Sequence, residues 1–196
     1  MSFKSIDVRT NTSRPIWFRQ VVSDLDRHEG FRPYAYPDPL SKIGKSYPAK
    51  KHGWGLRPAR AILAELGLSE ANGRPWTFGH GFTKGVTVDS SITKEQSTRR
   101  LEEEVVAHTA GLERLVPKWN TALPVYVVTV LVNMAYNLGI ERLSKFTTTL
   151  DLLNRGQYAE AGVNLRKSAW YKQVGNSAVE LTERLINGKI AREHMG

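Results

Sequence analysis

Residues 124–138 constrain the fold most, because apolar side chains occupy nearly every side of a helix drawn through them. Gly139 follows directly, and glycine is the residue type that most often ends a helix. A helix that is apolar all round must be buried, so we expect this one to form the centre of a helical bundle. Its longest apolar run, residues 125–132, is far shorter than the ~20 residues needed to cross a bilayer. The segment therefore predicts a core helix rather than a membrane span.

The rest of the second half also follows helical periodicity. Thr93 and Gln96 have the spacing of a capping box and open a predicted helix that stops before Pro117. Shorter helices are expected at residues 148–154, 158–167 and 176–187. The second half therefore predicts a helical lobe.

The first half combines a helix with extended segments. A helix is expected from Pro15 to Glu29, before Gly30. Residues 31–36 alternate aromatics with Pro and Arg and predict a strand, while residues 76–82 and 86–88 predict a hairpin. We expect one domain of the α+β class, with a small antiparallel sheet lobe at about 30–90 and a helical lobe formed by about 14–29 and 92–190. Residues 40–72, rich in Gly and Pro, are expected to be an insertion in the small lobe.

Composition excludes several kinds of site. The chain has no cysteine, which rules out disulfides, thiolate metal sites and Cys nucleophiles, and its five histidines lack metal-binding spacing. We therefore expect no metal and no cofactor. The net charge of +9 favours a polyanionic partner, such as nucleic acid, anionic lipid or a cell-wall polymer. Residues 40–72 alone carry +4, from six basic and two acidic side chains.

One pair of carboxylates has a spacing that suits acid–base chemistry. Glu29 ends the first predicted helix, and Asp38 follows nine residues later, after the extended segment. Two such carboxyl groups facing one cleft are what glycoside hydrolysis requires, one to protonate the leaving oxygen and one to assist the incoming water. With nineteen acidic residues in the chain, this spacing by itself discriminates poorly.

The sequence around the pair is more specific. Residues 28–38 read HEGFRPYAYPD and residues 76–83 read WTFGHGFT, which resembles the phage-type lysozymes and their pattern Glu-x8-Asp-x5-Thr-x-Gly-x-Gly. Further segments resemble the family in the same order: SITKEQ at 91–96, NMAYNLG at 133–139, KFTTTL at 145–150, EAGVNL at 160–165 and KSAWY at 167–171. Two departures stand out. Thirty-eight residues separate Asp38 from Thr77 instead of five, and Phe82 stands where the family often has His, with His80 between the glycines.

The resemblance implies a lysozyme-like fold whose active-site cleft lies between the two lobes. It implies that Glu29 is the general acid, Asp38 the second carboxylate and Thr77 the residue that holds the catalytic water. Saccharide contacts, or alternatively packing and capping roles, are implied at four further positions: Thr83, Tyr136, Thr149 and Asn164. Among the tryptophans, Trp54 lies between glycines and is the candidate for stacking on a sugar, whereas the others are expected in the core.

The family also implies a substrate and a biological setting. The expected activity is cleavage of the β-1,4 bond between N-acetylmuramic acid and N-acetylglucosamine in peptidoglycan, by a monomeric endolysin that lyses the host. The N-terminus resembles no signal peptide, so we expect the protein to stay in the host cytoplasm until a holin-type lesion releases it to the periplasm.

Several alternatives remain open. The chain would also suit a virion-associated entry muramidase, a lytic transglycosylase, or a non-catalytic protein that binds peptidoglycan or nucleic acid. Because the basic residues gather in an insertion rather than in a stripe interleaved with aromatics, no nucleic-acid partner is expected. The basic insertion is expected either to attract anionic lipopolysaccharide or peptidoglycan, or to act only as a solubilising loop.

Overall fold

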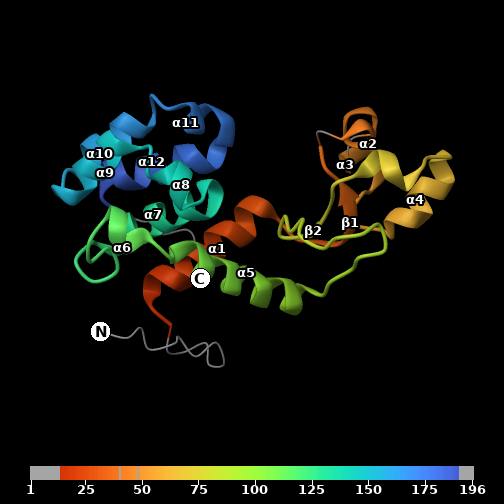
Figure 1. Ribbon diagram of the computed structural model, residues 1–196, viewed down its shortest axis with the longest axis horizontal. Helices are drawn as coiled ribbons and strands as arrows, with labels where there is room; N and C mark the ends of the chain where they lie inside the picture. Colours follow the sequence, from red (N-terminus) through yellow and green to blue (C-terminus); the bar gives the residue numbers. More distant parts are fainter. Residues whose placement is uncertain (1–13, 40, 48, 190–196) are drawn as a thin grey trace. The chain divides into compact units, whose positions relative to one another are not determined.

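The computed structural model describes residues 14–39, 41–47 and 49–189 and is mostly helical, with a two-stranded antiparallel sheet (Figure 1). This confirms the predicted α+β class. The chain divides into two compact units, which we call the helical unit, residues 14–24 and 104–189, and the sheet unit, residues 25–103. Helices α1 (Ile16–Glu29) and α5 (Lys94–Thr109) each contribute residues to both units.

The helical unit is built around α7 (Val125–Leu138). Residues 127–135 of this helix are all buried, which confirms the predicted central helix, and Gly139 follows its last residue. Helix α12 (Asn176–Asn187) packs on α7 and on α10 (Tyr158–Leu165), which in turn packs on α9 (Thr147–Asn154). The unit also contains three short helices, α6 (Leu112–Leu115), α8 (Ile140–Leu143) and α11 (Ala169–Val174). Among the described helices, none combines the length and hydropathy that a membrane span requires.

A buried polar network crosses the core of the helical unit. The guanidinium of Arg184, on α12, donates hydrogen bonds to both carboxylate oxygens of Asp24, at 2.7 and 3.2 Å. It also donates to the hydroxyl of Thr129, at 2.9 Å. The side chains of Arg184 and Asp24 are only 2% and 1% exposed. Because water cannot solvate these buried groups, the positive charge of Arg184 and the negative charge of Asp24 compensate each other.

The sheet unit pairs β1 (Arg32–Pro37) with β2 (Trp76–Gly79). The insertion between the strands folds into α2 (Lys42–Ser46), α3 (Ala49–His52), α4 (Ala59–Leu66) and the 3₁₀ helix η1 (Glu70–Gly73). These elements share a core with the strands, formed by Ala35, Ile43, Trp54, Ala59, Ile62, Leu63, Trp76 and Val88. The insertion is therefore packed against the sheet as part of one core.

Local sequence signals near α5 are confirmed in detail. The backbone N–H of Thr93 donates to the side-chain oxygen of Gln96 at 3.0 Å, and the N–H of Gln96 donates to the hydroxyl of Thr93 at 3.2 Å. This is the reciprocal pair of hydrogen bonds that a capping box makes.

Two expectations for the sheet unit are wrong. Residues 86–88 form turns rather than the second arm of a hairpin, because Val88 is drawn into the core and β2 turns back on itself through the pairing of Phe78 with Phe82. Trp54 is fully buried, with its ring centre 6.0 Å from that of Trp76. It therefore packs in the core and is not available to stack on a sugar.

Candidate functional site

Glu29 is held at the end of α1, where the helix stops. The N–H of Gly30 donates to the carbonyl of Asp26 at 3.1 Å, and Gly30 then takes a left-handed conformation with φ of 68°. The carboxyl group of Glu29 lies over the backbone of Gly81, since a β-carbon at position 81 would be 3.5 Å from Oε2 of Glu29. The Thr-x-Gly-x-Gly segment and the end of α1 therefore meet at this carboxyl group.

The surroundings of Glu29 favour its protonated form. Protein atoms displace much of the water around the carboxyl group, and this desolvation raises the pKa of Glu29 above its ordinary value. The nearby positive charge of His28 acts in the opposite direction and lowers the pKa, but it does not cancel the effect of burial. A carboxyl group that keeps its proton at higher pH is suited to act as a general acid.

Strand pairing brings Asp38 next to Thr77 despite the long insertion. The N–H of Asp38 donates to the carbonyl oxygen of Pro75 at 3.0 Å, and Tyr36 is paired with Thr77. The two ends of the insertion are thus held together by the sheet. Asp38 and Thr77 become diagonal neighbours on adjacent strands, a relation that places Cα atoms ~7–8 Å apart.

The alternation of the strands decides which side chains share a face. Pro37 and Trp76 are paired with each other and are both buried, Trp76 in the core of the sheet unit. Because side chains alternate along a strand, Thr77 and its cross-strand partner Tyr36 share the other face, although Tyr36 also packs against this core. Asp38 directly follows the last residue of β1 and is hydrogen-bonded to Pro75, two residues before Thr77.

Tyr36 is a further candidate residue that the sequence did not indicate. Burial raises the pKa of its phenol, and the negative charges of Glu29 and Asp38 raise the pKa further, against the opposing charge of Arg32. The guanidinium carbon of Arg32 lies 5.2 Å from the centre of the Tyr36 ring. The charges of both candidate carboxylates therefore act on the same hydroxyl group.

The first helix of the insertion packs against the backbone of Asp38. The carbonyl of Asp38 accepts a hydrogen bond from the N–H of Ser41 at 2.9 Å, and the hydroxyl of Ser41 caps α2 by accepting from the N–H of Gly44 at 2.9 Å. Helix α2 approaches so closely that a β-carbon at Gly44 would lie 2.0 Å from the Asp38 carbonyl oxygen and 2.8 Å from the Cα of Pro39. Glycine is required here because backbone fills the space of a side chain.

A second polar cluster surrounds His80, which lies in the turn at residues 79–81. His80 is buried, with Nε2 2.6 Å from Oδ1 of Asp26 and Nδ1 2.7 Å from the hydroxyl of Ser97. Lys94 also pairs with Asp26. Burial acts to raise the pKa of Asp26, but hydrogen bonds from Lys94 and His80 outweigh it, so the pKa is lowered overall.

This cluster has the composition of a Ser-His-Asp triad but cannot work as one. Ser97 is fully buried, so no substrate can reach its hydroxyl group. The cluster instead fastens the turn at residues 79–81 to α1 one turn before Glu29. The sequence signal for this contact was the departure from the family pattern, in which His80 lies between the glycines and Phe82 stands where the family often has histidine.

The four predicted saccharide-contact residues are distributed over both units. Thr83 is exposed in the sheet unit and lines a pocket there. In the helical unit, the hydroxyl of Thr149 donates to the side-chain oxygen of Asn164 at 2.8 Å, and both line a pocket of about 330 Å³ together with Lys145 and Ser168. The ring of Tyr136 packs against His108, with ring centres 5.0 Å apart. Within the part of the chain that the structure describes, no group of three or more His, Cys, Asp or Glu side chains is placed to hold a metal ion.

Comparison with known proteins relates the chain to a family of phage enzymes and to a phage spike protein. The family model described as phage lysozyme matches residues 63–186, which include Thr77 and all four predicted saccharide-contact residues, whereas Glu29 and Asp38 precede the matched region. The pre-baseplate central spike protein Gp5 of Enterobacteria phage T4 is 27% identical over 106 residues. That match covers 51% of this chain and 18% of the spike protein, so the chain corresponds to a small part of this relative.

Proposed function

We propose that this chain, which belongs to the phage lysozyme family, hydrolyses the β-1,4 bond between N-acetylmuramic acid and N-acetylglucosamine in peptidoglycan. The observation that carries the proposal is the carboxyl group of Glu29, whose pKa is raised by burial and which acts on the same tyrosine as Asp38. Glycoside hydrolysis needs two carboxyl groups, one that donates a proton and one that accepts a proton.

In the proposed reaction each group has one task. Glu29 donates its proton to the glycosidic oxygen as the C–O bond breaks, so that the leaving sugar departs as a neutral alcohol. A water molecule held by Thr77 and Asp38 attacks the anomeric carbon and gives a proton to Asp38. The hydroxyl group of Tyr36 is proposed to orient the carboxyl groups whose charges act on it. Thr83, Tyr136, Thr149 and Asn164 are proposed to contact the glycan chain.

The test is lysis together with product analysis. The protein should clear a suspension of permeabilised Gram-negative cells and release fragments that end in reducing N-acetylmuramic acid. In ¹⁸O-labelled water the new reducing end should carry the label. Fragments that end in a 1,6-anhydro sugar without label would instead establish a lytic transglycosylase, and an absence of new ends would establish a non-catalytic binder.

A host-lysis role and a virion role differ in where the protein is found. For lysis, we propose that the protein accumulates in the host cytoplasm and reaches the wall through a holin-type lesion. The match to a protein named as a central spike component favours a second candidate, an entry enzyme carried in the virion. Immunoblots of purified phage particles and of infected cells distinguish the two, because a lysis enzyme is abundant in late-infected cells and absent from washed particles.

The pH dependence of the reaction should report the proton on Glu29. Because Glu29 must be protonated to act, the rate should fall as the pH rises through its raised pKa. His28→Gln removes the charge that favours the ionised form, so it should move this decline to higher pH. Clearing rates between about pH 4 and 8 at constant ionic strength measure the shift. A decline that moves to lower pH in His28→Gln would contradict the assignment, and His52→Gln provides the control.

Gly44→Ala should impair catalysis by displacing Asp38. The added methyl group cannot fit against the carbonyl oxygen of Asp38, so the backbone of residues 38–39 must move. A displacement of about 1 Å in a catalytic group can cost 10²-fold in rate, and we expect a fall in kcat of at least about tenfold. Ser46→Ala changes an exposed side chain on the same helix and should keep the wild-type rate. A Gly44→Ala protein with wild-type kcat would show that α2 does not position Asp38.

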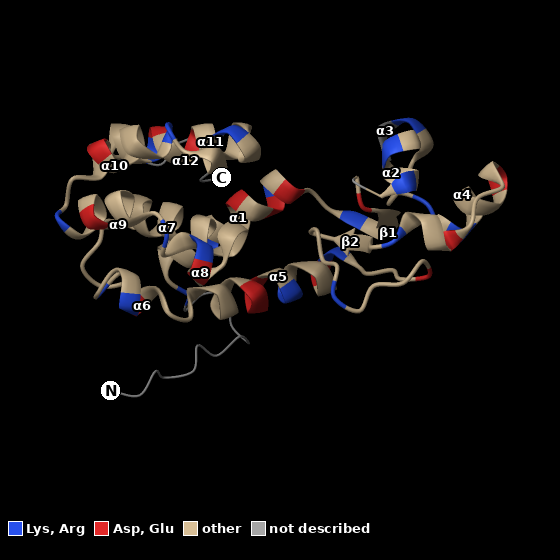
Figure 2. Cartoon of the chain, turned by 45° about the horizontal axis from the view of Figure 1, so that its top comes forward, with Lys and Arg blue, Asp and Glu red and all other residues tan. Residues whose placement is uncertain are grey.

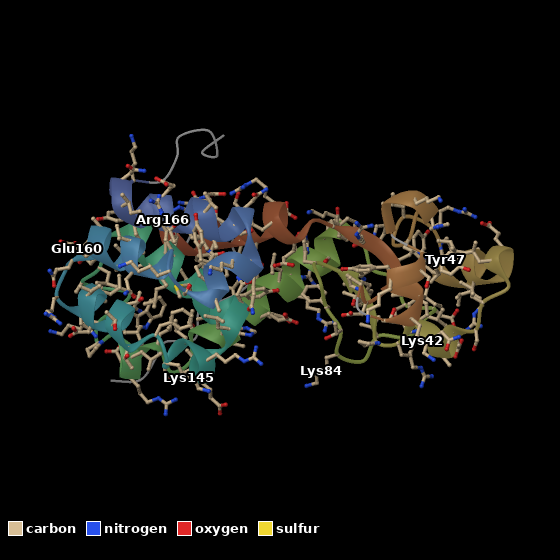
Figure 3. The ribbon with its side chains drawn as sticks, turned by 90° about the horizontal axis from the view of Figure 1, so that it is seen from above. Lys42, Tyr47, Lys84, Lys145, Glu160 and Arg166 are labelled. Atoms are coloured by element: carbon tan, nitrogen blue, oxygen red, sulfur yellow. The ribbon has the colours of Figure 1, made fainter. Side chains whose placement is uncertain are left out.

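The exposed lysines of the insertion are proposed to attract anionic lipopolysaccharide or peptidoglycan. Figure 2 shows basic residues on α2 and α3, and Lys42 is also labelled in Figure 3. Arg57 and Arg60 of the insertion pair with acidic side chains, whereas Lys42, Lys45 and Lys51 are exposed and make no ion pair with a described residue. The side chain of Lys50 lies outside the described residues. The unpaired charge of the insertion thus gathers on α2 and α3.

Replacing Lys42, Lys45 and Lys51 by Gln should slow lysis at low salt and flatten its dependence on salt. Exposed charges are screened over ~8 Å at physiological ionic strength, so steering weakens as salt is added. Clearing rates across a salt series measure the effect. The control replaces three exposed basic residues of the helical unit, Arg142, Lys172 and Lys189, by Gln. Equal salt curves for the wild type and the lysine variant would leave the insertion as a solubilising loop.

A further inference from the structure

A pocket in the sheet unit is lined by the insertion on one side and by the segment after β2 on the other. It has a volume of about 620 Å³. The insertion contributes Arg60 and Glu70, Arg74 follows it directly, and the segment from β2 onward contributes Trp76, Thr83 and Asp89. The volume is that of a typical small-ligand site, and the lining mixes both charges with apolar surface.

The pocket adjoins the strand that carries Thr77. Its wall includes Pro75, whose carbonyl accepts the hydrogen bond from the N–H of Asp38, and Trp76, which precedes Thr77 in the chain. Thr83, a predicted saccharide contact, belongs to the same wall. The pocket is therefore built from the chain segments that flank Thr77 in the sequence, on the face of β2 that Trp76 occupies.

The two arginines of the pocket differ in how strongly they pair with its carboxylates. Arg60 donates two hydrogen bonds of 2.6 Å to the carboxylate of Asp89 and a third, of 3.2 Å, to Glu70. Arg74 pairs with the same Glu70 only at 3.9 Å, and its side chain is 71% exposed. Arg74 is therefore the guanidinium best placed to take a carboxylate from a ligand, in the two-pronged geometry that arginine favours. Glu70 and Asp89 remain as acceptors for an amino group.

Such a lining fits a ligand that carries both carboxylate and ammonium groups. In peptidoglycan the two sugars are uncharged once the lactyl group of N-acetylmuramic acid is joined to its peptide. The carboxylates and free amino groups belong to the peptide stems. Resting on the proposed function, we infer that this pocket binds the peptide stem of peptidoglycan, with Arg74 holding a stem carboxylate. The pocket then adds a contact to the peptide in a protein that is proposed to act on the glycan.

Binding of soluble fragments tests this inference without any turnover. The probes are the disaccharide N-acetylglucosaminyl-N-acetylmuramic acid with a tetrapeptide stem, the same disaccharide without peptide, and chitobiose, which has no carboxylate. The wild type should bind the tetrapeptide form roughly tenfold more tightly than the other two. Arg74→Gln should remove this preference, while its melting temperature stays at the wild-type value because the side chain is exposed.

Arg57→Gln is the matched control. It removes one exposed arginine charge from the insertion, outside the pocket lining, and should keep the tenfold preference. A preference that survives Arg74→Gln would overturn the assignment. Equal binding of both disaccharides, with chitobiose weaker, would also overturn it, because the lactyl carboxylate would then be the ligand.

Failure of the inference and failure of the proposed function give different results. A wild-type protein that generates reducing ends but shows no preference for the stem retains the hydrolase activity and lacks the stem site. A protein that prefers the stem but generates no new ends retains the stem site and lacks the hydrolase activity.

Discussion

Glu29→Gln should reduce the lytic rate by about 10²–10⁴-fold, the contribution expected of a general acid. Glutamine keeps the shape of the side chain and can still donate a hydrogen bond, but it has no proton to transfer to the leaving oxygen. Folding should be unaffected, because the substitution removes a carboxyl group whose ionised form is disfavoured by burial. Clearing of permeabilised cells and a thermal melt on the same sample separate the two effects.

Glu160→Gln is the control for the loss of one carboxyl group. Glu160 is exposed on α10 and is labelled in Figure 3. This variant should clear cells at the wild-type rate. If Glu29→Gln keeps more than about a tenth of the wild-type rate, Glu29 is not the general acid, because the loss of a general acid should reduce the rate by about 10²–10⁴-fold.

The parts of the fold that local sequence determines could be predicted. Helix α7 is apolar on nearly every side, and Thr93 and Gln96 carry the capping signal within four residues. The two parts of the candidate site were also indicated, since Glu29 and Thr77 stand in short motifs. That the carboxyl group of Glu29 lies against Gly81 depends on packing between the end of α1 and the turn after β2, which no local signal encodes.

The residues that sequence missed act through distant partners. Tyr36 matters because the charges of Glu29 and Asp38 both act on it. His80 matters because Asp26 and Ser97 lie on either side of its ring. The prediction for Trp54 failed for the same reason. Its flanking glycines suggested an exposed, flexible tip, whereas its ring packs against that of Trp76. Contacts between residues far apart in sequence decided each case.

The largest loss of stability is expected from Arg184→Met. The substitution removes the guanidinium and leaves the carboxylate of Asp24 buried without the two hydrogen bonds that Arg184 donates to it. Breaking one partner of a buried ion pair costs about 3–5 kcal/mol of unfolding free energy. For a chain of this size that corresponds to a fall in melting temperature of roughly 6–20 °C.

Two further variants test whether the buried negative charge of Asp24 causes that loss. Arg166→Met breaks the pair between Arg166, labelled in Figure 3, and Glu183. The two side chains are 40% and 45% exposed. Exposed pairs contribute about 0–1 kcal/mol, so this control should melt close to the wild type. Adding Asp24→Leu to Arg184→Met removes the buried carboxylate as well and should restore most of the lost stability, since buried ion pairs often gain little over apolar residues of similar volume. If the double variant melts no higher than Arg184→Met alone, the loss comes from packing around the arginine side chain rather than from the buried charge.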